Sequence, residues 1–557
     1  MGTTTTDTTL AEMQPAAAAG HRTGATPIPG AVVDCLLIAL AAIAIAAVLR
    51  PFQSTPFIDD WVYGWPVQHL LETGELRIPE YSGNPIVTQI FWGVVFSLPF
   101  GFSFTTLRIS TWTLAIAVLW AVYLLLRDSG ASRQTARLGA AIMGVYPIFF
   151  VLSPTFMTDV PFLALLVWSV LLFTRALDRR QPRLVWMASL LCCVSVGVRS
   201  QGVGIIGAMF MTLLLHTGRW GRQPHLLIAP LLVLPAVGTL LAWLPSHMLV
   251  SADLTWIGNA PANRVRDLRE YALPVLPMML VIALMFVTTA LGVALLPLVL
   301  GVFRWCMVGR SALLVAVLSV IWVAGTYGGI KFWVPLKPGE TWALEELGAT
   351  ASLVPEYCGI LPFPPWAGWI TTGIGLALAS VLLANFPFRR LTEREKFIVW
   401  VMAGQCALTA MLWLFYDRYI LVYLPLAIVL CLARQPSIRF RPAWAGVVLY
   451  GAVSMIGTRD HLAYNAAVWS GVAELQAQGV PAAELNGGYV VNGWLQYVRP
   501  EQAHRSPEGR IEIPWVNEQL ELSYTVANWP RRDAKVLKTI PYACWLRPSG
   551  AVYVLKR

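Results

Sequence analysis

The run AVVDCLLIALAAIAIAAVL, residues Ala31–Leu49, decides the class of fold. It is apolar and close to the length of about 20 residues that a helix needs to cross a bilayer. The Thr/Ala/Pro-rich stretch before it, residues 1–30, has no apolar period, which is typical of a disordered tail. Because that stretch lacks the basic region of a cleaved signal, we expect the run to remain as a membrane anchor.

The composition of the whole chain extends this interpretation. Of its 557 residues, 57% are hydrophobic and only 13% are charged, about half the charged share of an average soluble domain. The net charge of +10 comes from basic residues that cluster in short loops between apolar runs. That pattern indicates membrane topology and argues against a nucleic-acid partner.

The sequence therefore predicts an all-α polytopic membrane protein with about thirteen transmembrane helices. The predicted spans are Ala31–Leu49, Thr105–Leu126, Leu138–Leu152, Val160–Thr174, Leu184–Val198, Val203–His216, Leu226–Leu244, Pro274–Phe303, Ser311–Ile330, Trp366–Asn385, Phe397–Tyr416, Tyr419–Ala433 and Ala443–Gly457.

The loops between these spans differ in charge, which predicts the topology. One set is short and arginine-rich and is expected in the cytoplasm: RDSGASRQTAR, RALDRRQPR, HTGRWGRQPH, RWCMVGR, FPFRRLTEREK and RQPSIRFRP. The other set, including the loop after the first span and the whole segment from Thr458, then faces outward. We expect a multi-pass protein of the plasma (inner) membrane, with the amino terminus inside and the carboxyl terminus outside.

One apolar piece, Pro85–Phe100, is not counted as a span. Counting it would place the loop RDSGASRQTAR outside and invert every later loop. It is short, contains Gln89 and Gly93 and is nearly bounded by prolines, so we expect an interfacial helix in the first outer loop.

The last hundred residues have mixed composition and predict a small extracytoplasmic α/β domain. Residues 461–480 have helical spacing, whereas Gly487–Val498 and Gly550–Arg557 are expected to be strands. The predicted organisation is a cytoplasmic tail, residues 1–30, a membrane domain, residues 31–457, and this outer domain, residues 458–557.

The cysteines have no metal-binding spacing. Six lie in or beside apolar runs and are expected to serve as small packing residues: Cys35, Cys192, Cys193, Cys306, Cys406 and Cys431. The other two, Cys358 and Cys544, fall in predicted outer segments, where they could form a disulfide.

Three carboxylates lie at the predicted outer face. The stretch DDWVYGWPVQHLLETG begins with Asp59 and Asp60 and predicts a helix that ends at Gly74. Asp159, in SPTFMTDVPF, lies at the outer end of the fourth span, ahead of Pro161. Helix capping is the simple alternative at both places. One carboxylate suffices for a cap, however, and ionisable residues beside a bilayer are usually functional.

Three arginines lie at the same level: Arg108 in TTLRIST, Arg199 in GVRSQG and Arg418 in FYDRYIL. Each could instead extend toward lipid headgroups. A guanidinium is also suited to a phosphate ester, which it grips with two parallel hydrogen bonds.

Carboxylates and arginines together predict base chemistry beside a bound phosphate. Nucleotide sugars are cytoplasmic, so an outward site needs another activated donor, and a sugar carried on a polyprenyl phosphate fits. The pair Asp59-Asp60 is therefore not interpreted as a nucleotide-binding DxD element, since no βαβ pattern surrounds it.

At these residues the chain resembles the GT-C superfamily of membrane glycosyltransferases, and within it the protein O-mannosyltransferase family that includes the aminoarabinose transferases. The resemblance rests on Asp59-Asp60 in the first outer loop and on GFSFTTLR, FMTDVPF and YDRYILVYLP. It covers Ala31–Gly457. The family often has Asp-Glu at the acidic pair, and the aminoarabinose enzymes have a lysine where this chain has Asn84.

The resemblance implies an inverting transfer of a sugar from a polyprenyl-phosphate donor to a hydroxyl of a protein, lipid or polysaccharide acceptor. Asp60 is then the expected base, or Asp59 if the helix starts one residue earlier, and Asp159 assists in the acceptor pocket. Arg199, with Arg108 or Arg418, would neutralise the departing phosphate.

A divalent cation could bridge carboxylate and phosphate, but no His/Asp constellation marks a metal site, and His69 is expected to be an interfacial residue. Two rival functions are a transporter or flippase of lipid-linked precursors and a non-catalytic subunit. A transporter should show repeated halves with polar groups at mid-membrane. Neither is visible in the sequence.

Overall fold

The computed structural model describes residues 29–215, 225–235, 237–240, 248–249, 273–303, 317, 365–386, 391–411, 417–433, 438–514, 520–545 and 549–557. The predicted tail, residues 1–30, lies outside this set except for Pro29 and Gly30, which belong to the first helix, and most of the predicted span Ser311–Ile330 lies outside it as well. The first helix, α1, runs from Pro29 to Leu49.

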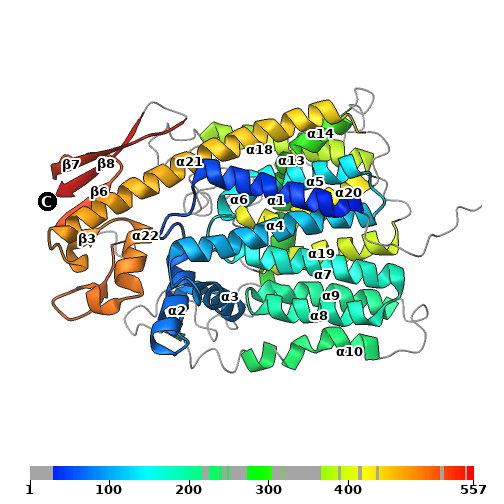
Figure 1. Cartoon of the computed structure of the whole chain (residues 1–557), viewed down its shortest axis with the longest axis horizontal. Coiled ribbons are helices and arrows are strands. Elements are labelled where there is room, and N and C mark those ends of the chain that lie inside the picture. The colour runs from blue at the N-terminus through cyan, green and yellow to red at the C-terminus, as the bar shows by residue number, and fades with distance from the viewer. Residues whose placement is uncertain are drawn as a thin grey trace, which may run out of the picture.

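Most of the described chain is helical, and the helices lie side by side in a bundle (Figure 1). The bundle consists of α1 with α4 Phe104–Asp128, α5 Arg133–Val145, α6 Pro147–Leu152, α7 Asp159–Arg179, α8 Pro182–Val196, α9 Val203–Leu215, α10 His225–Leu231, α13 Leu273–Ala294, α14 Leu296–Val302, α18 Pro365–Asn385, α19 Glu393–Ala410 and α20 Leu424–Ala433.

Three described helices are long and apolar enough to cross a membrane, namely Gly30–Leu49, Phe104–Asp128 and Asp159–Arg179. A fourth candidate is the pair Met279–Ala294 and Leu296–Val302, bent by 67° at Leu295. Several further apolar helices have 10 to 17 residues. The predicted membrane class is consistent with these helices, whereas the number of about thirteen spans stays a prediction.

In two of the predicted spans a break lies next to a proline. Leu138–Leu152 is divided into α5 and α6 because Tyr146 is extended (φ −61°, ψ 124°) ahead of Pro147. A residue before proline is disfavoured in the helical region, and proline itself lacks an N–H donor. Pro297, the second residue of α14, follows the bend at Leu295 and likewise lacks an N–H donor.

The first outer loop folds as the sequence predicts. Helix α2, Asp60–Thr73, ends at Gly74, which has φ 75° and takes the left-handed conformation that favours glycine. The predicted interfacial piece contains the short helix α3, Val87–Ser97. Both helices lie at the same end of the bundle (Figure 1).

The predicted end of the last span is not the end of a helix. Helix α21 runs for 38 residues, Phe440–Ala477, without interruption at Gly457. It extends from the bundle to the C-terminal sheet (Figure 1), so the predicted division at 457/458 lies within one helix. The division into three domains stays a prediction.

The C-terminal sheet has the strand order β3-β6-β8-β7. Strand β6 is parallel to β3 and antiparallel to β8, and Val526 pairs with Val554. The inner face of the sheet packs on α21, where Val552 and Val554 of β8 and Val472 of α21 belong to one buried cluster. The strands are β3 Leu485–Asn486, β6 Tyr524–Ala527, β7 Lys535–Tyr542 and β8 Gly550–Lys556, besides the short pairs β1 Ile78–Pro79 with β2 Met248–Leu249 and β4 His504–Arg505 with β5 Ile511–Glu512.

One of the two predicted C-terminal strands is wrong. Gly550–Arg557 forms β8 as expected, but Gly487–Val498 is helical, as α22 Tyr489–Asn492 followed by a π-helical turn, Gly493–Tyr497. The side-chain amide Nδ2 of Asn492 donates to the side-chain Oδ1 of Asn486 at 2.9 Å and closes this turn locally. Such side-chain bonds compete with strand pairing.

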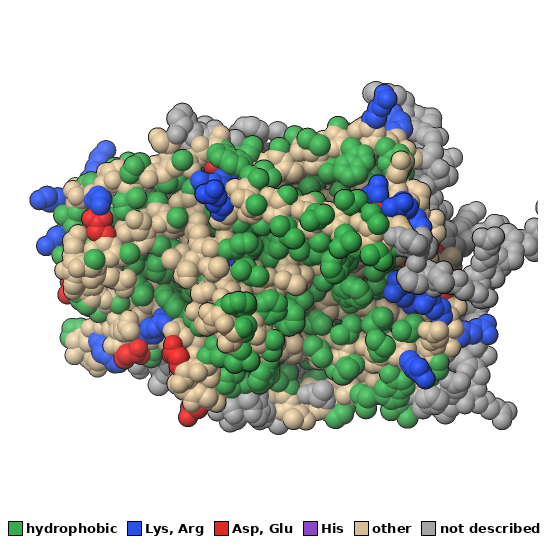
Figure 2. All heavy atoms as spheres, in the orientation of Figure 1, with side chains coloured by type: hydrophobic (Ala, Val, Ile, Leu, Met, Phe, Trp, Pro, Cys, Tyr) green, Lys and Arg blue, Asp and Glu red, His purple; other side chains and the backbone are tan. Residues whose placement is uncertain are grey.

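Apolar side chains cover the middle of the face shown in Figure 2, and charged side chains gather toward its two ends. On α1 the large hydrophobic residues Leu36, Leu40 and Ile43 are each more than half exposed. A helix so exposed and so apolar is suited to face lipid.

Candidate functional site

The backbone is strained just before the two aspartates. Ile58 has φ 55°, a conformation that β-branched residues rarely adopt. Asp59 precedes α2 in the N-cap position, yet its side chain makes no capping hydrogen bond. Strained backbone persists only where the surroundings hold it, and it concentrates at functional sites.

Asp60 is held in a buried clamp. Its Oδ2 accepts from Nε and Nη2 of Arg108 at 3.1 and 2.9 Å, and its Oδ1 accepts from the N–H of Phe156 at 2.7 Å. Both charged side chains are 0% exposed. Arg108 also donates to the carbonyl oxygens of Gln53 and Thr55, each at 2.6 Å. The clamp therefore ties the start of α2 to α4 and to the loop before α7.

Burial raises the pKa of Asp60 to about 6, while Arg108 acts in the opposite direction. With Arg108 on one carboxylate oxygen and a backbone N–H on the other, the group is held rigidly in place.

Asp59 lies in a second group of charges, which we term the outer cluster: Asp59, Asp159, Arg199 and Arg418. Nη1 of Arg418 lies 3.4 Å from Asp59 Oδ2, and its Nε lies 3.9 Å from Asp159 Oδ1. Nη2 of Arg199 lies 2.7 Å from the same oxygen of Asp159. The structure thus brings together four of the six predicted site residues in one network of net charge zero and places Asp60 and Arg108 in the clamp.

Burial differs within the outer cluster. The side chains of Asp59 and Arg418 are 17% and 11% exposed, whereas Asp159 and Arg199 are almost fully buried. Arg418 contacts both aspartates, at 3.4 and 3.9 Å, and is the more exposed of the two arginines.

Asp159 begins α7, but neither it nor Thr158 caps the helix with its side chain. The Thr158 hydroxyl instead accepts from Arg199 Nε at 2.7 Å. Oδ1 of Asp159 is in ion-pair contact with both arginines, whereas among the described residues no group hydrogen-bonds to its Oδ2. A buried carboxylate with unused acceptor capacity requires an explanation, and a substrate hydroxyl would supply one.

The sequence analysis missed Tyr489. Its hydroxyl donates to Asp59 Oδ1 at 2.7 Å from α22, across 430 residues of chain. Burial, followed by the charge of Asp59, raises the pKa of Tyr489 well above its usual value, so this phenol stays a donor. No local pattern marks Tyr489, because a tyrosine in an aromatic stretch is ordinary.

Aromatic rings pack beside Asp59. Trp61 is fully buried and stacks on Tyr81 at 5.6 Å, while Tyr489 and Tyr497 meet its edge. Gly493 lies against the Trp61 ring, where a Cβ would come within 2.3 Å. The contact between α2 and the C-terminal region is therefore tight, and it positions Tyr489.

The described residues contain no group of three or more His, Cys, Asp or Glu side chains placed to hold a metal ion. His69 stacks on Trp65 at 4.8 Å, an aromatic contact on α2. The predicted disulfide cannot be placed, because Cys358 lies outside the described residues. Of the predicted packing cysteines, Cys192 is fully buried.

The comparisons with known proteins concern the middle of this site. Residues 84–243 match the family model described as dolichyl-phosphate-mannose-protein mannosyltransferase. The matched region contains Arg108, Asp159 and Arg199, whereas Asp59, Asp60 and Arg418 lie outside it. The resemblance to the protein O-mannosyltransferase family is confirmed over this region. No curated protein matches the sequence.

Solved structures of two proteins resemble the chain. One is ArnT from Cupriavidus metallidurans bound to undecaprenyl phosphate, with 12% sequence identity and a TM-score of 0.40. The matched region spans 93% of this chain and 97% of the ArnT chain. The apo form of that protein gives 11% identity, a TM-score of 0.41, and coverage of 94% and 98%.

The second protein is the oligosaccharyltransferase AglB from Archaeoglobus fulgidus, in complex with an inhibitory peptide and a dolichol-phosphate. It has 11% identity and a TM-score of 0.40, and covers 90% of this chain and 69% of its own. Scores at this level do not establish a common fold, so the proposal below depends on the family match and on the outer cluster.

Proposed function

We propose, from the mannosyltransferase-family region at residues 84–243 and from the outer cluster, that the protein is an inverting glycosyltransferase. It moves a hexose or pentose from a polyprenyl-phosphate donor to an acceptor hydroxyl at the extracytoplasmic face of the membrane. The observation that carries the proposal is the juxtaposition of Asp59 with Arg418, which places a carboxylate beside a guanidinium at 3.4 Å.

Asp59 is the base in this proposal, in preference to Asp60. A base must reach the proton that it takes, and Asp59 is partly exposed while Asp60 is enclosed by Arg108 and Phe156. The Tyr489 hydroxyl donates to Oδ1 of Asp59, and Arg418 lies beside Oδ2. The carboxylate is therefore oriented before the substrate arrives.

The transfer step consists of one proton transfer, one bond formed and one bond broken. Asp59 accepts the proton of the acceptor hydroxyl, and the oxygen forms a bond to the anomeric carbon from the face opposite the phosphate. The bond between that carbon and the phosphate oxygen breaks, its electron pair leaves with the phosphate, and the configuration inverts. Arg418 neutralises the charge on the leaving phosphate, and Arg199, whose Nη2 lies 2.7 Å from Asp159 Oδ1, orients Asp159 toward the acceptor.

Arg108 takes no part in phosphate binding in this proposal, because all its described hydrogen bonds lie within the clamp. Its role is to hold Asp60 and, through Asp60, the start of α2 on which Asp59 stands.

The proposal is tested by incubating membranes with labelled polyprenyl-phosphate hexoses and pentoses and measuring transfer. We expect Asp59→Asn to lower the transfer rate by about 100-fold or more, since general base catalysis contributes at least that much. The melting temperature of Asp59→Asn should stay near that of the wild type. Full transfer by Asp59→Asn would refute the assignment of the base.

Asp60→Asn is the matched control at the neighbouring position. Removing one partner of a buried ion pair costs about 3–5 kcal/mol, so Asp60→Asn should be less stable than the wild type. If Asp60→Asn were stable but inactive while Asp59→Asn remained active, Asp60 and not Asp59 would be the base.

A further inference from the structure

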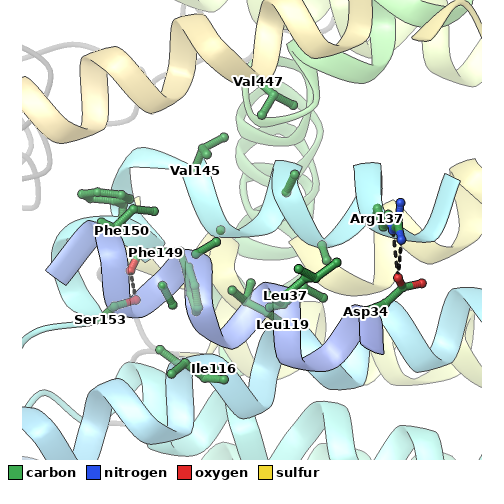
Figure 3. Close-up of a pocket in the computed structure, with 18 of the residues that line it drawn as sticks. Asp34, Leu37, Ile116, Leu119, Arg137, Val145, Phe149, Phe150, Ser153 and Val447 are labelled. Carbon is green, nitrogen blue, oxygen red and sulfur yellow. Dashed lines mark hydrogen bonds and ion pairs between the residues drawn. The ribbon is translucent and has the colours of Figure 1, made fainter. Parts of the chain in front are cut away.

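A cavity of about 510 Å³ lies on the side of the bundle where α1 packs, between α1, α4, α5, α6 and α21 (Figure 3). Its walls include Leu37, Ile116, Leu119, Val145, Phe149 and Val447. The volume is within the range of small-molecule sites in proteins, about 300–1,000 Å³. We term this cavity the α1 groove. It contains none of the residues of the outer cluster or of the clamp.

The charged residues of the α1 groove lie at one end, where Asp34 and Arg137 form an ion pair (Figure 3). Near the other end the Ser153 hydroxyl donates to the carbonyl oxygen of Phe149 at 2.6 Å. Between these ends the walls are predominantly apolar, which suits a hydrocarbon chain.

Among the described residues, the charged end carries a net positive charge when Arg133, which pairs with Asp34 but does not line the groove, is counted with Arg137. Asp34 is buried and accepts from Arg133, Arg137 and Tyr123, with Arg133 Nη2 at 2.8 Å. The two arginines are 45% and 42% exposed. One carboxylate therefore faces two guanidiniums, and the excess charge is accessible to an anion from outside.

These arginines belong to the loop RDSGASRQTAR and the helix it opens, which the positive-inside rule places at the cytoplasmic face. Anionic lipids attract basic groups at that face. An anion held at Arg133 and Arg137 would thus be a headgroup of the cytoplasmic leaflet.

The length of the groove matches one leaflet. On α1 its lining extends from Asp34 to Ile45, which at 1.5 Å per residue is roughly 16 Å. Half of the hydrocarbon core of a bilayer is about 15 Å. The groove also has exposed walls, since Leu37 and Trp444 are 50% and 40% exposed, so a chain can enter sideways from the bilayer.

We propose that the α1 groove binds one acyl chain of an anionic phospholipid from the cytoplasmic leaflet, with the phosphate of that lipid at Arg133 and Arg137. The lipid would hold α1 against α4, α5 and α21 and would stabilise the folded protein. This site is independent of the proposed transfer reaction.

The experiment compares the full-length protein in nanodiscs of phosphatidylcholine with and without phosphatidylglycerol. We expect phosphatidylglycerol to raise the melting temperature by about 3 °C, because a ligand of the folded state stabilises it. Native mass spectrometry should show retained phosphatidylglycerol. Equal melting temperatures in the two kinds of nanodisc would overturn the proposal.

Arg133→Gln tests the headgroup contact, since Arg137 still pairs with Asp34 in this variant. Binding of phosphatidylglycerol should weaken about fivefold, the equivalent of about 1 kcal/mol for one arginine near a membrane surface. Arg183→Gln, at an exposed arginine on α8 outside the groove, is the matched control. Equal weakening by both variants would mean general surface attraction and would refute a specific site.

Gly144→Leu tests the acyl-chain contact. Gly144 lines the groove, and a Cβ there would meet Leu119 at an ordinary 3.4 Å, so a larger side chain fills the groove without a clash at that atom. Gly207→Leu on α9, where a Cβ meets nothing within 4 Å, is the control. We expect only Gly144→Leu to abolish the melting-temperature difference between the two lipids. If Gly144→Leu retains the full difference, the groove is not the binding site.

Discussion

Asp59 and Asp60 are neighbours in the chain, and yet their carboxylates have different partners. Asp60 pairs with Arg108 without exposure to solvent, and Asp59 meets Tyr489 and Arg418 at the margin of a partly exposed cluster. The strained Ile58 and the helix start immediately after it turn the two side chains apart. At the scale of single residues, adjacent aspartates thus have separate tasks.

Tyr489→Phe removes the hydroxyl that donates to Asp59 of the outer cluster. A hydrogen bond to a charged group contributes about 1.5–3 kcal/mol, so loss of orientation at Asp59 should lower kcat about tenfold or more with little change in KM for the donor. Steady-state transfer assays measure both constants. Tyr497→Phe, at a tyrosine that packs on Trp61 and hydrogen-bonds to the backbone of Tyr81, is the control. An unchanged kcat in Tyr489→Phe would exclude a positioning role.

His461 makes stability depend on pH. Burial lowers the pKa of His461 to about 4 from its ordinary 6.5, and its ring packs on Phe57 at 4.5 Å. Between pH 6.5 and 4 the unfolded chain therefore binds more protons than the folded one, so stability is lost as pH falls through this window, by at most about 1.4 kcal/mol per pH unit.

Melting temperatures at pH 7.5 and 5.5 measure this effect. We expect His461→Gln to reduce the difference between the two temperatures, and His504→Gln, at a partly exposed histidine, to leave it unchanged. If the melting temperatures at the two pH values differed as much in His461→Gln as in the wild type, the prediction would be contradicted.

At the scale of elements, proline and glycine determine where helices break and how closely they approach. Pro147 divides α5 from α6, and Pro297 follows the bend between α13 and α14. Helix α21 has no proline between Phe440 and Ala477 other than Pro442 in its first turn, where proline is tolerated. It therefore continues from the bundle to the sheet.

Gly292 and Gly375 set the contact between α13 and α18. A Cβ at Gly292 would lie 1.9 Å from the carbonyl oxygen of Gly375, so the two backbones touch. Gly292→Ala should destabilise the protein by about 1–3 kcal/mol, the usual cost of overpacking. Gly373→Ala, where a Cβ meets nothing within 4 Å, is the control and should be neutral or stabilising. Thermal unfolding in one detergent compares the two, and equal stability would mean that the helices can separate without cost.

At the scale of the whole molecule, apolar side chains cover the middle of the face shown in Figure 2, and charged side chains gather toward its two ends. The C-terminal sheet and α2 lie toward one end (Figure 1). The outer cluster forms where the starts of α2 and α7 meet Arg199, which follows α8, and Arg418, which precedes α20. Arg133 and Arg137 begin α5, whose loop is expected at the opposite membrane face.

The predicted sidedness is tested with a tag after Arg557. On intact cells or spheroplasts an impermeant reagent should label this tag, since the segment from Thr458 is expected outside. A tag inserted between Ser129 and Ser132 is the control and should react only after permeabilisation. Protection of the tag at Arg557 would reverse the predicted topology.

The sequence by itself determined the features that depend on neighbouring residues. Apolar runs predicted α1, α4 and α7, and Gly74 predicted the end of α2. Alternation also predicted β8, but the same rule was wrong at Gly487–Val498, where side-chain bonds and packing on Trp61 favour helical turns.

Only the tertiary structure decided which charges meet. Arg108 and Asp60 are 48 residues apart, and Arg418 and Asp59 are 359 residues apart. Residue types at the outer face predicted that carboxylates and arginines gather there, because membrane topology depends on local composition. The pairing of Asp60 with Arg108, and of Asp59 with Arg418 and Tyr489, depends on how α2 packs against distant elements, and no local pattern encodes that packing.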